Sequence, residues 1–372
     1  MSLQAPARPL APASVSLRKL AGTTHRLLAL ALGLLLAVMG LTGAMLSFRA
    51  ELEHAFAPQL HRVLPGETFL SVQKLRDLAI EERPETTVKT IRLPLNPDRS
   101  ARVSLTNGED VLLDPYRGQV LGIQRPELTV MGMVERFHRE LWLSTLGNRT
   151  VGTAALVLAV LIVTGWILWL PRRVSLLASR LRLPFGQQGR QLTYNLHNTL
   201  GFYTAVPLLI LALSGASFTF KESVLAFYGA LTSSASSVAP PPRVTPVEGA
   251  PLALDAGVAQ AQARFPQAAL SSVFLPKSPR DPLRVVLKQP GETHPLGKTT
   301  VFVDPYRGTV LDILDPGEAP TAWRLYYTLN YPLHTGELGG MPLRILNMAT
   351  SLMPAFLFVT GLLIWLPKRR RP

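Results

Sequence analysis

The chain has 372 residues, 47% of them hydrophobic, and a mean hydropathy of +0.22. These values are high for a soluble protein and indicate membrane segments combined with soluble parts. The chain has no cysteine, which excludes disulfides, iron–sulfur clusters, thiolate haem ligation and cysteine-based zinc sites. Its formal net charge is +14, and the position of the basic residues decides whether that charge serves nucleic acid, a membrane surface or membrane topology.

The chain begins with a basic tail, 1–26, and an apolar run, 27–48. A bilayer crossing takes about 20 residues, so we expect the first transmembrane helix at 27–48. The apolar run is too long for the core of a signal peptide, and an internal segment resembles it. We therefore predict an uncleaved anchor.

A soluble module is predicted at 49–130. Its pattern predicts a helix at 70–82 with Ser71 as N-cap, followed by strands at 87–93, 101–105, 111–113 and 119–123. The segment Asp114-Pro-Tyr-Arg-Gly118 is typical of a turn in which the aspartate binds its own backbone. A helix followed by an antiparallel meander indicates a small α+β module.

An interfacial helix carrying His138 is predicted at 131–146, before a second transmembrane helix at 147–170. His138 and Trp169 are 31 residues apart, which would make one straight helix of about 46 Å. Because this length exceeds the bilayer, we expect a break at Gly147. We interpret the Trp-Leu-Pro-basic sequence that ends this span as an interface anchor.

A basic loop, 171–196, leads to a third transmembrane helix at 197–220. Basic residues also gather in both tails, and the full set comprises Arg8, Arg18, Lys19, Arg26, Arg172, Arg173, Arg180, Arg182, Arg190 and 368–371. Under the positive-inside rule, both termini and this loop are cytoplasmic, and the two long connections lie outside. The positive charge thus serves topology in a lipid bilayer, and we expect no nucleic-acid partner.

The second long connection is predicted to hold a linker rich in Ser and Pro, 233–246, within a second module at 221–322. The order of elements repeats that of the first module: a helix at 254–265, then strands at 272–275, 283–287, 300–303 and 309–313. An interfacial segment with His334 follows at 323–342 and is expected to break at Gly336, Gly339 and Gly340. The fourth transmembrane helix is predicted at 343–366, and the C-tail at 367–372.

The two halves of the chain resemble each other. The segment Val163-Thr-Gly-Trp-Ile-Leu-Trp-Leu-Pro171 matches Val359-Thr-Gly-Leu-Leu-Ile-Trp-Leu-Pro367, and the same offset carries His138 onto His334. The match of 40–48 with 212–220 carries His25 onto His197. We therefore predict a membrane α-helical fold, a four-span bundle built from an internal duplication, with two periplasmic α+β modules.

The topology sorts these four histidines into two pairs. His25 can face His197 on the cytoplasmic side, and His138 can face His334 on the outer side. Neutral imidazoles are axial ligands of low-spin haem, and facing helices of a bundle can hold such a ring. The pattern favours two haems, one per leaflet, over the alternative of hydrogen-bonded interface histidines. The remaining histidines, at 54, 61 and 294, are expected to be solvated or structural.

Four arginines lie near these histidines in the sequence: Arg26, Arg139, Arg149 and Arg344. Charge-assisted hydrogen bonds to haem propionates are one interpretation of this proximity, and ordinary interface anchoring is the other.

The motifs Gly40-Leu-Thr-Gly43, Asp-Pro-Tyr-Arg-Gly, Phe137-His-Arg-Glu-Leu141 and Leu168-Trp-Leu-Pro171 together resemble those of the PepSY-associated transmembrane proteins. This resemblance implies that the outer modules are PepSY domains. It also implies kinship with inner-membrane ferric-siderophore reductases of Gram-negative bacteria, which carry b-type haems on histidines. The two haem b groups are then expected on His25, His138, His197 and His334.

The expected function is a reductase of the bacterial inner membrane. Electrons would enter from a cytosolic flavoprotein or a quinol, because no nucleotide-binding motif is present in the sequence. They would reach a ferric siderophore held between the two modules. Two alternatives stay open: a non-enzymatic PepSY binding or regulatory protein, and a transport accessory protein.

Overall fold

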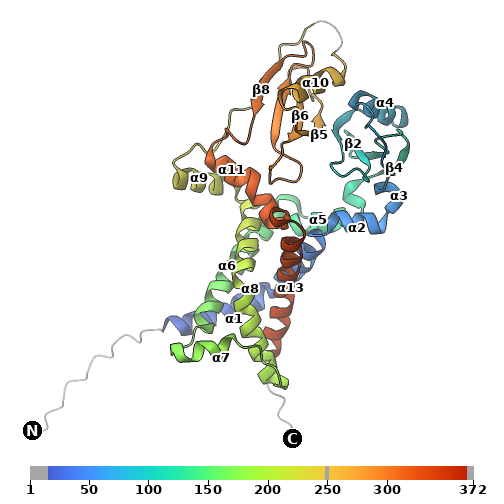
Figure 1. The fold of residues 1–372 in the computed structure, drawn as a ribbon. Coiled ribbons are helices and arrows are strands. Elements are labelled where there is room, and N and C mark those ends of the chain that lie inside the picture. Colours follow the sequence, from blue (N-terminus) through green and yellow to red (C-terminus); the bar gives the residue numbers. More distant parts are fainter. Residues whose placement is uncertain (1–15, 248–250, 367–372) are drawn as a thin grey trace, which may run out of the picture.

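The computed structural model describes residues 16–247 and 251–366 (Figure 1). The expected basic residues Arg8 and 368–371, and the C-tail at 367–372, lie outside the described residues. In Figure 1 a bundle of long helices stands below a sheet domain.

Four helices are long and apolar enough to cross a membrane. They are α1 (Leu17–Leu46), α6 (Ser144–Trp169), α8 (Gly189–Thr219) and α13 (Gly340–Trp365). Helices α1 and α8 begin well before the apolar runs from which they were predicted. Hydropathy marks the part of a helix that crosses the bilayer, and the helix itself can extend beyond that part. The first turn of α1 is capped by Ser16, whose hydroxyl accepts a hydrogen bond from the backbone N–H of Lys19.

The bundle is a ring in which α1 and α8 stand diagonally opposite, since each packs against both α6 and α13. Glycines allow the close approach of α1 to α13. A Cβ at Gly40 would lie 2.3 Å from the backbone oxygen of Ser351, and one at Gly33 would lie 2.3 Å from the ring of Phe358. These positions exclude any larger side chain.

The break before the second span differs from the predicted one. Helix α5 (Val130–Glu140) ends where Leu141 and Trp142 adopt left-handed backbone conformations, and α6 begins at Ser144, so the break precedes Gly147. Gly147 instead allows close packing where α5 meets α6. A Cβ there would lie 1.6 Å from the backbone oxygen of Glu140, so only glycine lets α6 turn back against the end of α5.

The corresponding break before the fourth span is confirmed. Gly336 and Gly340 have φ of 83° and 62°, the left-handed region that favours glycine. The segment before Gly336 is helical and includes a π-helix that the sequence did not predict. It consists of α11 (Thr321–Arg324), the π-helix η3 (Leu325–Asn330) and α12 (Tyr331–Thr335), and η4 (Glu337–Gly339) follows between the two glycines.

The predicted helices and strands of both modules are confirmed within a few residues. Module one contains α4 (Val72–Glu82), β1 (Val88–Arg92), β2 (Ala101–Leu105), β3 (Asp110–Leu113) and β4 (Val120–Gln124). Module two contains α10 (Leu254–Arg264), β5 (Ala269–Phe274), β6 (Leu283–Lys288), β7 (Thr299–Val303) and β8 (Val310–Leu314). The predicted N-cap is also correct, since the Ser71 hydroxyl accepts a hydrogen bond from Lys74 N.

The two modules form one sheet, which the sequence did not predict. Strands β1 and β5 pair antiparallel, with Ile91 opposite Val273, and give the order β4-β3-β2-β1-β5-β6-β7-β8. Helices α4 and α10 cover one face of this sheet and share a continuous apolar core with it. The shorter connecting helices are α2 (Arg49–Phe56), α3 (Pro58–His61), η1 (Pro126–Leu128), η2 (Val174–Leu176), α7 (Leu177–Leu181) and α9 (Lys221–Thr232).

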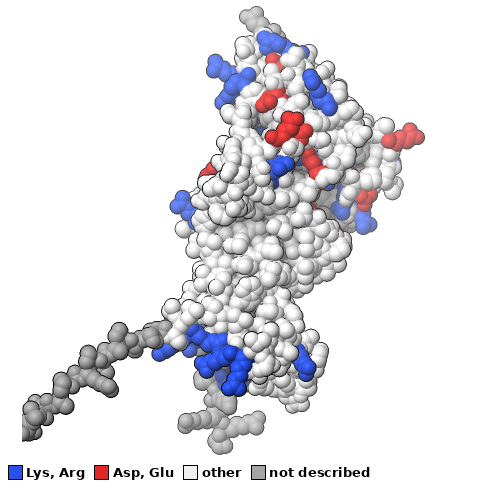
Figure 2. All heavy atoms as spheres, turned by 60° about the vertical axis from the view of Figure 1, so that its left-hand side comes forward, with Lys and Arg blue, Asp and Glu red and all other residues white. Residues whose placement is uncertain are grey.

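Charge is distributed unevenly along the molecule. Every Asp and Glu of the chain falls within 51–140 or 222–337, the two long connections. Figure 2 shows mixed charges over the sheet domain, a band without charged side chains along the bundle, and only basic groups at the opposite end. This arrangement and the four apolar helices make the chain a multi-pass membrane protein.

Candidate functional site

The four repeat-related histidines all point into the bundle from different elements. His25 and His197 lie on the diagonally opposite helices α1 and α8. His138 lies on α5 and His334 on α12, and their ring centroids are 6.5 Å apart, with 48° between the ring planes. The structure thus brings the outer pair together, as predicted. In the inner pair, His25 is close enough to act electrostatically on His197.

The two pairs occupy two levels of the bundle. His138 contacts Thr42 on α1, and His334 contacts Ser214 on α8. Thr42 follows His25 by 17 residues, and Ser214 follows His197 by the same number. Seventeen residues of α-helix span about 25 Å. The inner and outer pairs are therefore separated by nearly the thickness of a hydrocarbon core.

Each imidazole binds a hydroxyl group through Nδ1. The distances are 3.0 Å from His25 to Thr164, 2.9 Å from His138 to Thr42, 2.9 Å from His197 to Thr360 and 3.0 Å from His334 to Ser214. In every case the hydroxyl belongs to a different helix from the histidine. These contacts fix the orientation of all four rings.

A glycine follows each of these hydroxyl residues and makes room for the ring. A Cβ would lie 3.1 Å from Cε1 of His138 at Gly43, and 3.0 Å from Cε1 of His334 at Gly215. The inner pair is slightly less tight, at 3.4 Å for both Gly165 and Gly361. Each of the four histidines thus packs against a Thr-Gly or Ser-Gly pair on a neighbouring helix.

This donor set fits a haem with two axial histidines. Two imidazoles that share one metal through bonds of about 2 Å have ring centroids roughly 6 Å apart, which agrees with 6.5 Å in the outer pair. Among the hydrogen bonds of the described residues, none involves Nε2 of these histidines. Near the inner pair, the buried indole N–H groups of Trp166 and Trp169 also have no partner within the described ranges, as expected where a bound group supplies an acceptor.

Burial keeps the outer pair neutral. It lowers the pKa of His138 to about 4, and burial together with the nearby His138 lowers the pKa of His334 to about 4. Neutral imidazole is the form that ligates metals.

The four arginines are placed less uniformly. Arg344 donates to the backbone oxygen of Ser47 at 2.7 Å and to the carboxylate of Glu51 at 2.7 Å, so it ties α13 to the end of α1. Arg139 donates to Glu135 at 3.3 Å from an exposed position. Arg26 and Arg149 are exposed. These contacts commit the Arg344 guanidinium to protein partners at the end of α1.

The other three histidines lie outside the bundle, and all are buried. His54 contacts the backbone oxygen of His61 at 3.1 Å, and His294 accepts a hydrogen bond from Leu296 N. This agrees with a structural role and contradicts a solvated one. The interface-anchor interpretation also fails for Trp169, which is 3% exposed and stacks on Phe202, whereas its counterpart Trp365 is 51% exposed.

The sequence prediction missed the hydroxyl groups, although the signal was present. Thr42-Gly43, Ser214-Gly215, Thr164-Gly165 and Thr360-Gly361 all lie in the blocks that align the two halves. From the sequence alone, these glycines indicate close helix approach or room for a planar ligand. The partner of each hydroxyl depends on which helices are neighbours, and a pairwise repeat does not show this.

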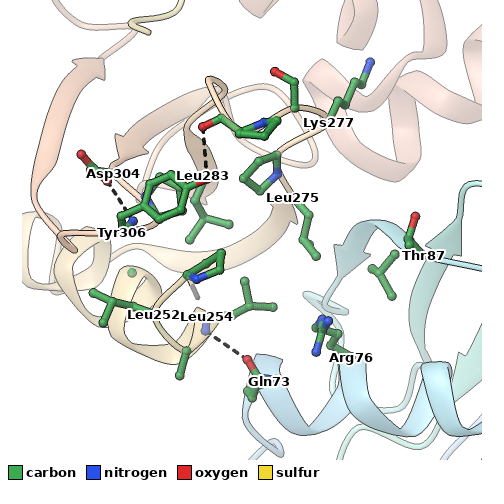
Figure 3. Close-up of a pocket in the computed structure, with 18 of the residues that line it drawn as sticks. Gln73, Arg76, Thr87, Leu252, Leu254, Leu275, Lys277, Leu283, Asp304 and Tyr306 are labelled. Atoms are coloured by element: carbon green, nitrogen blue, oxygen red, sulfur yellow. Dashed lines mark hydrogen bonds between the residues drawn. The ribbon is translucent and has the colours of Figure 1, made fainter. Parts of the chain in front are cut away.

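A cleft of about 1030 Å³ lies between the two modules. Figure 3 shows Arg76 rising from α4 on one side, with Lys277 on the loop after β5 on the other. Its floor is apolar, formed by residues such as Leu254 and Leu283. Asp304 lines the cleft too, but its carboxylate accepts hydrogen bonds from Tyr306 N and from Arg307 within its own turn. Arg76 also pairs with Asp77 at 2.9 Å, so the cleft offers the charge of Lys277 and a partly neutralised Arg76 above an apolar floor.

The cleft and the outer histidine pair lie at opposite ends of β1. Val88, at the start of the strand, lines the cleft. Arg92 lies at the other end of the strand, on the same side of the sheet as the loop between β6 and β7. In that loop the ring of His294 lies 5.3 Å from that of Tyr331, which is on α12 with His334. A ligand in the cleft is therefore separated from the outer pair by about the length of β1.

One family model matches the chain, the PepSY-associated TM region, over residues 23–368. No curated protein is similar enough to count as a relative. The matched region includes all four spans, both halves of the sheet and all four paired histidines. The chain is a member of the PepSY-associated transmembrane family.

Proposed function

We propose that this protein is an oxidoreductase of a bacterial inner membrane that binds two b-type haems and carries electrons outward to a ferric siderophore, releasing ferrous iron in the periplasm. The observation that supports it is the pair of histidines at each of two levels, every ring held by a hydroxyl and a glycine. Bound haem supplies one-electron transfer at each level.

The charge pattern supports a side of the membrane for each level. His25 and His197 lie toward the basic end of the bundle, which the positive-inside rule places in the cytoplasm with both termini. His138 and His334 lie toward the sheet domain, which then stands in the periplasm as two PepSY modules derived from an internal duplication.

The electron balance needs a donor from outside the chain. A cytosolic flavoprotein or a membrane quinol releases two electrons, and these convert two Fe³⁺ ions to two Fe²⁺ ions. Siderophores bind iron through hard oxygen donors, which hold ferric iron more strongly than ferrous iron. Reduction therefore weakens the chelate and releases the metal.

The cleft between the modules supports capture of an anionic ferric chelate. Lys277 offers positive charge from one wall, and Arg76, which pairs with Asp77 at the surface, adds to it from the other. The volume suits a ligand of siderophore size. Because β1 separates the cleft from the outer histidines, we propose that the chelate is captured in the cleft and reduced after it moves toward His138 and His334.

Haem content tests the proposal first. We expect purified protein to contain two haems per chain, with the sharp reduced α-band of bis-histidine haem b. His25→Ala and His138→Ala should each lose one haem, while the matched control His54→Ala, a buried histidine outside the bundle, should keep both. Colourless protein from haem-replete cells would overturn the assignment.

Steady-state reduction tests the cleft. In liposomes with an internal reductant, we expect Arg76→Ala with Lys277→Ala to raise KM for a ferric chelate without changing haem content. Lys74→Ala, an exposed cation on α4, is the control. If colourless protein still bound anionic ligands through Arg76 and Lys277, the binding or regulatory alternative would be favoured instead.

A further inference from the structure

We infer that four hydroxyl residues are positioning residues that fix the tautomer of the proposed ligands, so that Nδ1 carries the proton and Nε2 presents its lone pair. They are Thr42, Thr164, Ser214 and Thr360. This inference rests on the proposed function for the ligand role of Nε2. The tautomer is inferred from the hydrogen-bond contacts and does not depend on bound haem.

Each hydroxyl donates its hydrogen to a backbone carbonyl of its own helix. Thr42 donates to Val38 O at 2.9 Å, and Thr164 donates to Val160 O at 2.8 Å. Ser214 and Thr360 do the same toward Ile210 O at 2.6 Å and Phe356 O at 2.9 Å. A hydroxyl has a single hydrogen to donate. With that hydrogen on the carbonyl, the hydroxyl oxygen accepts from the imidazole, and we infer the proton on Nδ1.

At His25, a backbone carbonyl gives a second and independent reason for the same tautomer. Nδ1 of His25 lies 3.1 Å from the carbonyl oxygen of Leu161, and a carbonyl can only accept. This contact requires a proton on Nδ1 of His25.

Because the same hydroxyl contact occurs at all four histidines, we infer one shared role for it. A ligating histidine needs a bare nitrogen turned toward the metal, and the partner of its other nitrogen sets both ring orientation and ligand basicity. Here every such partner is neutral, a hydroxyl or a carbonyl, across four helix pairs and two levels of the bundle. Loss of such a partner typically weakens metal binding about 10- to 100-fold.

The experiment removes one acceptor at a time and preserves shape. Thr42→Val and Thr164→Val delete the hydroxyl at the outer and inner level, and Thr42→Ser restores it. Thr204→Val is the matched control, because that α8 hydroxyl bonds only its own helix, at Leu200 O. We expect Thr42→Val to weaken haem binding about 10- to 100-fold and to shift the midpoint potential of the outer centre alone. Thr164→Val should affect only the inner centre.

Nitrogen-15 NMR of histidine-labelled, haem-free protein keeps the tautomer testable without haem. We expect the four bundle histidines to carry the proton on Nδ1, and Thr42→Val to change that signature for His138. Protonated Nε2 in the native chain would overturn the inference, and so would a Thr42→Val protein indistinguishable from Thr42→Ser in potential and haem affinity. A chain that shows the tautomer but binds no haem would overturn the proposed function only.

Discussion

Gly43 and Gly215 lie closer to the outer histidines than Gly165 and Gly361 lie to the inner ones. We therefore expect Gly→Ala substitutions to differ in severity. Gly43→Ala and Gly215→Ala should displace the outer rings, with a packing cost of about 1–3 kcal/mol, and should lower haem content or shift the outer centre. Gly165→Ala and Gly361→Ala should have smaller effects. Haem stoichiometry and optical redox titration measure both.

Gly201→Ala is the matched control for that series. Gly201 lies in the spanning helix α8, and a Cβ there would meet Leu357 at an ordinary 3.6 Å, so haem content should not change. Equal loss from Gly201→Ala and Gly43→Ala would mean that glycine acts through helix packing rather than through the histidine.

At the residue scale, the sequence identified the histidines but not the groups that hold them. Histidine is rare in this chain, with seven copies, and four of them occupy matching positions in the two halves. Threonine and serine are common in apolar helices, where their hydroxyls usually bond their own backbone. Only the helix order of the bundle shows which hydroxyls meet a neighbouring imidazole.

At the element scale, the loop between β6 and β7 contains a buried histidine with pH-dependent consequences. Burial, assisted by Lys298 and Lys288, lowers the pKa of His294 from 6.5 to about 3. Its ring lies 5.3 Å from that of Tyr331. Between these pH values the unfolded chain binds a proton that the folded chain does not. This part of the stability is therefore complete above pH 6.5 and is lost as pH falls toward 3.

His294→Asn provides the test, because an asparagine oxygen can accept the Leu296 N–H and does not titrate. We expect the thermal midpoint of the sheet domain, followed by circular dichroism, to fall less between pH 7 and pH 5 in the variant. The native slope from this one group is at most about 1.4 kcal/mol per pH unit. Parallel pH profiles would show that His294 charges without unfolding the loop.

The sequence predicts helices and strands most accurately where the pattern of apolar and polar residues repeats within a short stretch of the chain. The strands of both modules match within a few residues because alternation and turn residues lie close together in the sequence. The π-helix η3 and the break at Leu141 and Trp142 were missed, since ordinary side chains adopt these conformations under tertiary constraint. The pairing of β1 with β5 was also missed. The sequence of each module predicts only the hairpins within that module. No turn connects β1 to β5, so nothing nearby in the sequence indicates that they pair.

At the scale of the whole molecule, the segregation of charge makes a prediction about orientation. The chain has no cysteine, so a single introduced thiol reports one position. Glu67 is exposed beside the sheet domain, and Ser175 is exposed in the basic loop after α6. In spheroplasts, we expect a membrane-impermeant maleimide to label Glu67→Cys and to leave Ser175→Cys unlabelled until the cells are lysed.

Which of the two thiols is labelled from outside decides the direction of electron flow in the proposed function. If Ser175→Cys were labelled from outside and Glu67→Cys were protected, the sheet domain would face the cytoplasm, and the level of His25 and His197 would meet the periplasm. The electron path would then be inverted, and the ferric substrate could not lie where we place it. A permeant maleimide should label both variants, which shows that protection reports sidedness and not burial. Because acidic residues fall only within 51–140 and 222–337, both long connections should give the same answer.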